Sequence, residues 1–157
     1  MTHLLYNSTI RNYDYNEKGA IQSMNIAFLA HDRKKDLMVQ FCFAYKSILE
    51  KHTLCATNTT GKLITEATGL PVTLYLHANQ GGGQQIGARI SYNEIDLVIF
   101  LCDPQNKAGF DEVNSIERLC DQYQIPFATN IATAEVLILG LARGDLDWRD
   151  IVNPKRK

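Results

Sequence analysis

The chain has 157 residues, a length that suits one domain able to bury roughly two-thirds of the surface that its unfolded form exposes. Its 16 basic and 17 acidic residues give a formal net charge of −1. This balance provides no positively charged surface for DNA, RNA or an anionic membrane, so we expect neither nucleic acid nor a membrane as a partner.

The four cysteines are widely spaced and never form a Cys-x-x-Cys pair, and each lies in an apolar segment (Cys42, Cys55, Cys102 and Cys120). A reduced thiol in such surroundings behaves as a small hydrophobic group. No apolar run near the first residue resembles a signal peptide, and no stretch approaches the length of a membrane span. We therefore expect a soluble, cytoplasmic protein whose thiols are buried and reduced.

Residues 1–24 are polar and lack periodicity, and we expect an N-terminal extension that is partly disordered. Residues 25–157 are expected to form the domain. Here short apolar runs typical of β-strands alternate with segments of helical period. The five expected strands are residues 25–30, 53–56, 72–77, 96–102 and 126–129.

The segments between these runs predict helices. Between the first two runs, apolar residues recur at spacings of three, four and seven, which places them on one helix face: Leu37, Met38, Phe41, Tyr45, Ile48 and Leu49. Residues 111–123 repeat this pattern, and residues 131–142 predict a buried closing helix ended by Gly144. Residues 61–68 and 84–92 are shorter helix candidates. The sequence thus predicts an α/β domain of three layers with about five parallel strands.

Ligands of an open α/β sheet bind beyond the carboxyl ends of its strands, and the residues that follow the five runs are polar. The loop Thr57-Asn58-Thr59-Thr60-Gly61 leads into a helix, so its N–H groups and hydroxyls meet the positive end of a helix dipole. Lys35 could supply a cation to the same anion. Each feature has an ordinary alternative: the threonine loop could simply cap its helix, and Lys35 could be a solvated surface lysine. Because the loop and the lysine occur together at neighbouring strand ends, we favour a phosphate site.

Two further strand ends carry acids. His31-Asp32 follows the first run. A carboxylate beside an imidazole can set the tautomer of the imidazole or share a proton with it. Alternatively, Asp32 only caps the next helix. Asp103 follows the most apolar run and precedes Pro104, and turn former and site residue are equally good interpretations.

Five collinear segments resemble methylglyoxal synthase in order and spacing, and the similarity extends from Asn25 to about Leu141. They are Ala30-His31-Asp32 with Lys35, residues 56–61, residues 81–87, residues 103–106 and residues 125–134. The resemblance implies a Rossmann-like α/β domain assembled as a homohexamer, without cofactor or metal. It also implies elimination of phosphate from dihydroxyacetone phosphate through an enediolate, with inorganic phosphate as an inhibitor.

The resemblance implies roles for individual residues. His31 and Asp32 match the family's His-Asp pair near the substrate oxygens, and Asp103 matches the acid of its Asp-Pro motif. The expected phosphate ligands are Lys35, Thr57, Thr59 and Thr60, with Asn58 at the glycine of the family's threonine loop. His77 and Ala78 stand where the family has a Ser-Gly phosphate contact.

The largest departure from the family pattern lies in the stretch HANQGGGQQIG at residues 77–87. The family's Gly-Gly-Asp-Gln-Gln places its catalytic base where this chain has Gly83, so impaired or altered catalysis is expected. Phe110 and Val113 replace a His and an Asp beyond the Asp-Pro motif. Asp111 and Glu112 are adjacent, but on a helix a shift of one residue turns a side chain by about 100°.

Two functions therefore remain open. The first is an enzyme: a methylglyoxal synthase, or a lyase or isomerase acting on a related phosphorylated compound. The second is a non-catalytic phosphate-ligand binder, since the same fold serves as the regulatory domain of carbamoyl phosphate synthetase, which is an analogy of fold.

Overall fold

The computed structural model describes residues 23–152 of the chain. The expected N-terminal extension therefore lies outside the described residues except for Ser23 and Met24. Met24 is fully buried in the hydrophobic core directly before the first strand.

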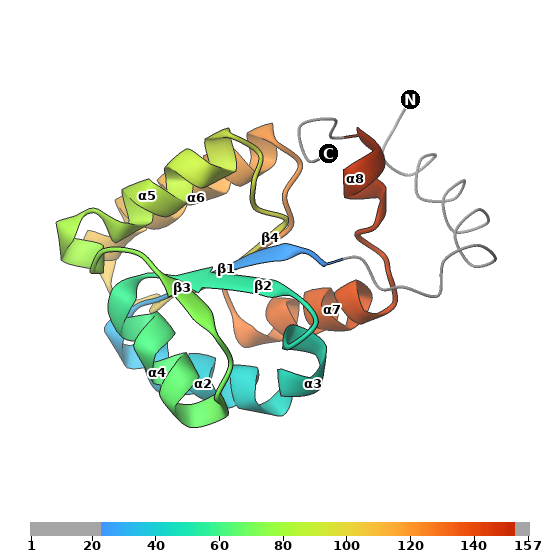
Figure 1. The fold of residues 1–157 in the computed structure, drawn as a ribbon. Helices are drawn as coiled ribbons and strands as arrows, with labels where there is room; N and C mark the ends of the chain where they lie inside the picture. Colours follow the sequence, from blue (N-terminus) through green and yellow to red (C-terminus); the bar gives the residue numbers. More distant parts are fainter. Residues whose placement is uncertain (1–22, 153–157) are drawn as a thin grey trace.

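A five-stranded sheet forms the centre of the protein (Figure 1). Its strands are β1 (Asn25–Ala30), β2 (Thr53–Ala56), β3 (Val72–Leu74), β4 (Leu97–Leu101) and β5 (Phe127–Ala128). They run in the order β3-β2-β1-β4-β5, and every neighbouring pair is parallel. The predicted α/β class with about five parallel strands is confirmed.

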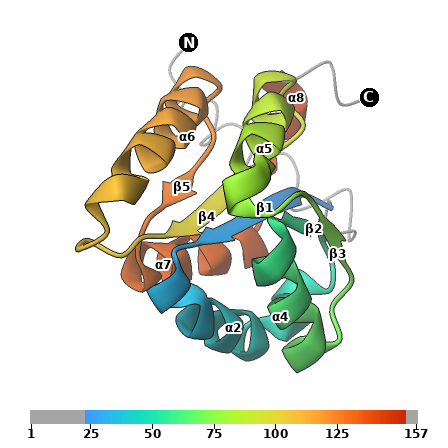
Figure 2. The same cartoon turned by 90° about the vertical axis from the view of Figure 1, so that its left-hand side faces the viewer.

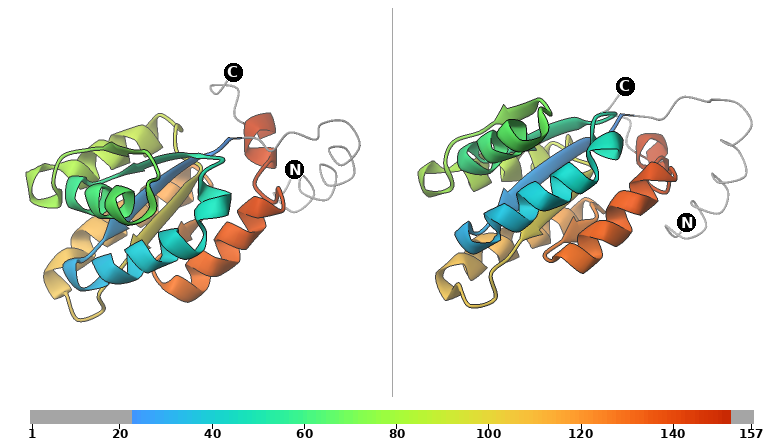
Figure 3. Two further views of the ribbon diagram at one scale, coloured as in Figure 1. Left: turned by 60° about the horizontal axis from the view of Figure 1, so that its bottom comes forward. Right: turned by 90° about the horizontal axis from the view of Figure 1, so that it is seen from below.

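Helices cover both faces of this sheet. One face carries α2 (Lys35–Ala44), α3 (Lys46–Leu49), α4 (Asn58–Thr68) and α7 (Ile131–Ala142), and the other carries α5 (Gly82–Ser91) and α6 (Phe110–Gln122) (Figure 2). The views in Figure 3 show α4, α2 and α7 side by side. Short 3₁₀ turns are η1 (Asp32–Lys34), η2 (Ala78–Gln80) and η3 (Lys107–Gly109), and α8 (Trp148–Val152) ends the described chain. None of the helices in residues 23–152 has the length and apolarity needed to cross a bilayer.

The central strand β1 shows why both faces must be covered. Successive side chains of a strand point to opposite faces. Ile26 and Phe28 accordingly pack in the cluster that includes α2, α4 and α7, whereas Ala27 and Leu29 pack in the cluster formed by α5 and α6. A strand apolar on both faces is stable only between two helical layers, which is the pattern of buried parallel sheets.

Some element boundaries differ from the prediction. The third strand ends at Leu74 and not at residue 77, because β3 lies at the sheet edge and the chain leaves the sheet after Leu74. Two single hydrogen bonds hold the chain beyond that point, from Tyr75 N–H to Ala56 O and from Asn58 N–H to Leu76 O. The single helix expected over residues 37–49 is broken at Tyr45 into α2 and α3.

The closing helix α7 is present but is not buried all round. Ala134, Ile138 and Leu141 face the core, whereas Val136 is 67% exposed and Leu139 is 45% exposed. A helix that is apolar on every side can be buried or can offer its outer face to another molecule, and sequence composition does not separate these cases.

The four cysteines are free thiols. Three are buried as predicted, and Cys102 is only half-buried. Burial raises the pKa of the Cys42 and Cys120 thiols to about 12 and that of the Cys55 and Cys102 thiols to about 11. Since the thiolate is the nucleophile, these side chains are packing groups and not reactive ones.

A buried ion pair ties α8 to the amino ends of the strands. The Arg149 guanidinium, 2% exposed, lies 3.1 Å from the carboxylate of Asp96, which is fully buried directly before β4. Arg149 also donates to the carbonyls of Gln124 and Ile95, and the second Asp96 oxygen accepts from the N–H of Asn25. This network lies at the end of the sheet opposite the strand carboxyl ends.

Candidate active site

Parallel strands bring their carboxyl ends to one edge, so the predicted polar residues gather there from separate parts of the sequence. His31 follows β1, Thr57 follows β2, Asp103 follows β4 and Asn130 follows β5. This edge also receives the amino ends of α2, α4, α5 and α6 (Figure 1).

The threonine segment forms the first turn of α4, one turn earlier than predicted. Thr57 is the N-cap residue, in extended conformation, and the first intrahelical bond runs from Gly61 N–H to Thr57 O. The N–H groups of Thr59 and Thr60 precede that bond and therefore have no partner within the helix. Within the described chain, the buried Thr60 Oγ1 and Asn58 Oδ1 also lack hydrogen-bond partners. The free N–H groups and the Thr60 hydroxyl are donors and suit this helix end to an anion with several acceptor oxygens, whereas Asn58 Oδ1 can only accept.

The chain after β3 closes this helix end from one side. The Thr59 hydroxyl lies 3.1 Å from His77 Nδ1, and both side chains are exposed. Ala78 begins η2 and is exposed as well. A Cβ on Gly82 would overlap the carbonyl oxygen of Leu76, so only glycine lets α5 begin so close to this loop.

Lys35 stands at the start of α2 with its side chain only 16% exposed. Its ammonium donates to the Ala30 carbonyl at 2.8 Å and pairs with Asp32 Oδ1 at 3.0 Å. The Asp32 side chain is 99% exposed, so the structure places this carboxylate on Lys35 at the protein surface.

The orientation of His31 is set from across the sheet. Its Nδ1 accepts the backbone N–H of Asp103 at 2.9 Å, and its ring packs edge-on against Phe100. A neutral imidazole that accepts at Nδ1 carries its proton on Nε2, so His31 offers an N–H donor at that atom. The Asp103 amide therefore sets the tautomer, a role for which the sequence had offered Asp32.

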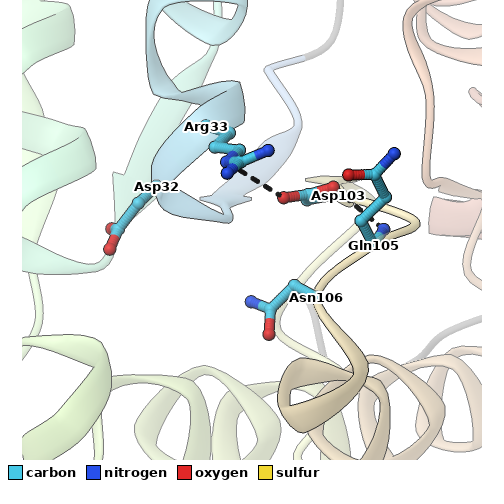
Figure 4. Close-up of a pocket in the computed structure, with 5 residues that line it drawn as sticks. All are labelled: Asp32, Arg33, Asp103, Gln105 and Asn106. Carbon is cyan, nitrogen blue, oxygen red and sulfur yellow. Dashed lines mark hydrogen bonds and ion pairs between the residues drawn. The ribbon is translucent and has the colours of Figure 1, made fainter.

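Asp103 has both of the expected features. Its Oδ1 accepts the N–H of Gln105 at 2.9 Å, which is a turn-forming bond, and its Oδ2 lies 3.9 Å from Arg33 Nε. Figure 4 shows Asp103 facing Arg33 while the Asp32 carboxylate points away from that pair. These residues line a cavity of about 340 Å³ together with Gln105 and Asn106.

Glu112 was not among the predicted site residues, yet it lies in this cluster. It is the third residue of α6 and is half-buried, with its carboxylate directed at Gly83 on α5. Desolvation raises the pKa of its carboxyl above the ordinary value, and the electrostatic attraction of His31 and Lys35 opposes that rise. The neighbouring positions Phe110 and Val113 do not join the cluster: Phe110 is 41% exposed and Val113 packs in the core.

The sequence analysis did not identify Glu112 as a site residue, because residue spacing gives positions on a single helix and not contacts between two helices. Contact with α5 depends on how closely the two helices pack, and a Cβ on Gly87 would lie 3.3 Å from Leu119 of α6. The sequence did contain one signal for this contact: an acid, Glu112, in the first turn of one predicted helix, and the three glycines of residues 81–83 at the start of another. Among residues 23–152, no three side chains of His, Cys, Asp or Glu are placed to hold a metal ion.

The model of the MGS-like domain family matches residues 37–129. Methylglyoxal synthase of Caldicellulosiruptor saccharolyticus is 63% identical over 133 residues, which cover 84% of this chain and 94% of that protein. The chain belongs to the methylglyoxal synthase family. Methylglyoxal synthase of Listeria innocua is 59% identical over 129 residues, covering 82% of this chain and 96% of the relative.

Structure supports the same family. The crystal structure of methylglyoxal synthase from Elizabethkingia anophelis NUHP1 superposes with a TM-score of 0.66 at 38% identity, over 74% of this chain and 77% of that one. The resemblance noted from the five segments and the Rossmann-like fold class are therefore confirmed.

Proposed function

We propose that the protein eliminates phosphate from dihydroxyacetone phosphate to give methylglyoxal. Besides family membership, one structural observation supports this reaction. A helix end suited to phosphate, with the unpartnered Thr60 hydroxyl and with Lys35 nearby, shares a sheet edge with a histidine held as an N–H donor. An elimination of this kind needs both an anion cradle for the leaving group and a donor for developing negative charge.

The proposed roles follow from this geometry. Thr57, Thr59 and Thr60, with Asn58 and Lys35, hold the phosphate, and His77 and Ala78 border it. His31 Nε2–H donates to the oxygen that becomes negative in the enediolate, and Asp103 holds the imidazole through its N–H. Asp32 neutralises part of the Lys35 charge.

Incubation of the purified protein with dihydroxyacetone phosphate tests the proposal. We expect methylglyoxal and inorganic phosphate in equal amounts, at a turnover of about 1–10³ s⁻¹, the usual range for enzymes. The absence of a carboxylate at Gly83 favours the second candidate, a non-catalytic phosphate binder. Binding of phosphate without any turnover would establish that alternative and refute the enzymatic one.

Inorganic phosphate is expected to stabilise the protein, by about 2.7 kcal/mol at one hundred times its dissociation constant. Replacing Thr59 and Thr60 by valine should remove most of this effect. Because Thr60 Oγ1 is buried without a partner and the contact of Thr59 with His77 is exposed, the double variant should lose little stability when phosphate is absent. Thermal unfolding with and without phosphate measures both quantities.

The exposed Thr73 of β3, replaced by valine, serves as the control and should keep the full response to phosphate. An unchanged phosphate response in the double valine variant would contradict the location of the site.

We further propose a homohexamer in the cytoplasm, as the family resemblance implies. The exposed apolar side chains Val136 and Leu139 on α7 suit a subunit contact, and four free thiols suit a reducing compartment. A monomeric mass measured by light scattering would contradict the assembly.

A further inference from the structure

Gly83 and Glu112 form a complementary pair across helices α5 and α6. A Cβ built on Gly83 would lie 2.8 Å from Glu112 Oε1, 2.9 Å from Cδ and 3.3 Å from Oε2. In an aspartate the carboxyl carbon is a single C–C bond, about 1.5 Å, from Cβ. The Glu112 carboxylate therefore occupies the region into which an aspartate at position 83 would place its own carboxylate.

The backbone does not require glycine at position 83. Gly81 has φ of +101°, which favours glycine, and Gly82 adjoins the Leu76 carbonyl. Gly83 has neither a positive φ nor a backbone atom in its way, and it sits within the first turn of α5. Glycine within a helix costs about 0.5–1 kcal/mol relative to alanine, and any side chain at position 83 would meet the Glu112 carboxylate.

Glu112 does not serve to cap its own helix. A glutamate at the third helical position commonly accepts the N–H of the N-cap residue. Here the N-cap is Gly109, and its N–H donates to Asn106. In the part of the chain that the structure describes, no hydrogen bond or ion pair engages the Glu112 carboxylate, so both oxygens are free to accept a proton.

The surroundings of Glu112 suit proton abstraction. His31, which follows β1, and Lys35 of α2 act on it electrostatically, and Gly83 of α5 lies against its carboxylate. Desolvation outweighs these attractions and raises the pKa of the carboxyl. A carboxylate with a raised pKa is a stronger base, and its product acid is formed beside the histidine that would hold the new enediolate charge.

We propose that Glu112 is the general base of this protein and replaces, from a different helix, the aspartate that the family pattern places at Gly83. The inference rests on the proposed reaction. Glu112 takes a proton from the hydroxymethyl carbon, and the C–H electron pair becomes the C=C bond of the enediolate while the carbonyl oxygen takes the negative charge. The enediolate then collapses: its terminal hydroxyl loses a proton to the departing phosphate and becomes the aldehyde C=O, the C=C bond shifts to the methylene carbon, and the C–O bond to phosphate breaks, its electron pair leaving with the phosphate. The resulting enolate takes up, at its methylene carbon, the proton held by Glu112, which gives methylglyoxal and restores the Glu112 carboxylate.

Glu112→Gln tests this role because it keeps the shape of the side chain and removes its basicity. We expect kcat to fall about 10²–10⁴-fold, the usual effect of losing a general base. Exchange of the carbon-bound protons of dihydroxyacetone phosphate with D₂O should fall in parallel, while thermal stabilisation by inorganic phosphate stays at the wild-type value. Glu117→Gln, an exposed position on the same helix, should leave all three measurements unchanged.

Restoring the acid on the other helix separates catalysis from structure. The double variant Gly83→Asp with Glu112→Ala, in which alanine vacates the space that an isosteric glutamine would still fill, should recover most of the rate that Glu112→Gln loses. Its acid limb of kcat/KM should move, because a different carboxyl titrates. Gly83→Asp alone should leave the rate near that of the wild type, since the two carboxylates compete for one space and repel each other.

The outcomes are distinct. Full activity of Glu112→Gln beside an active wild type would overturn the role of Glu112 and leave the proposed function standing. An inactive wild type would overturn both. Loss of phosphate binding together with rate in Glu112→Gln, or a large gain in rate from Gly83→Asp alone, would also overturn the role.

Discussion

Replacement of Arg149 by methionine is expected to lower the free energy of unfolding by about 3–5 kcal/mol, the usual cost of leaving a buried charge without its partner. Asp96 is fully buried and would keep its carboxylate without the guanidinium that lies 3.1 Å away. The carbonyls of Gln124 and Ile95 would lose a donor at the same time. Urea denaturation at fixed protein concentration measures the loss.

Arg143→Met is the matched control. Arg143 pairs with Asp145 at 3.0 Å, but its side chain is 64% exposed, so this change should cost about 1 kcal/mol or less. Because the Arg149 network lies at the strand amino ends, folded Arg149→Met should retain wild-type kcat. Equal stability of the two variants would show that the buried pair contributes no more than the surface pair.

Substitution of His31 by asparagine is expected to lower kcat by about 10²–10³-fold, the range found when one donor to a developing oxyanion is removed. An asparagine oxygen can still accept the Asp103 N–H that now bonds Nδ1, so the fold and the Asp103 loop should be kept. The outer N–H donor at Nε2 would be lost. Steady-state kinetics with dihydroxyacetone phosphate, combined with thermal unfolding, measure the two effects separately.

His31→Gln should show the opposite balance, with a smaller loss of rate and a larger loss of stability than His31→Asn. Its amide reaches the Nε2 position and keeps a donor there, but leaves the Asp103 N–H without its acceptor, at a cost of about 1–3 kcal/mol in stability. The glutamine variant should therefore be more active and less stable than the asparagine variant. If the two variants have the same rate, the Nε2 donor has no part in the reaction.

Periodicity predicted the fold class because burial imposes it locally. Each strand of a doubly covered parallel sheet must be apolar on both faces, and β1 and β4 are short apolar runs for that reason. The boundaries of β1 and β2 agreed with the prediction, whereas β3 ended early. An edge strand is held from one side only, and its sequence does not record where the neighbouring strand stops.

The helix end at the threonine segment was predictable for a similar reason. Threonines before a helix act through backbone N–H groups of the same segment, so their chemistry is contained in residues 57–61. The sequence also located His31 and Asp103 at strand ends. It did not show that the Asp103 amide, and not the Asp32 carboxylate, bonds to the His31 imidazole. Asp103 and His31 are 72 residues apart in the chain.

The sequence by itself determined the family, the α/β sheet and the helix that begins in the threonine segment, because each depends on residues close together in the chain. Only the tertiary structure decided which carboxylate faces the place of the absent aspartate. Close packing of α5 on α6 brings Glu112 to Gly83, and that contact depends on the distance between two helices, which no spacing within either helix encodes.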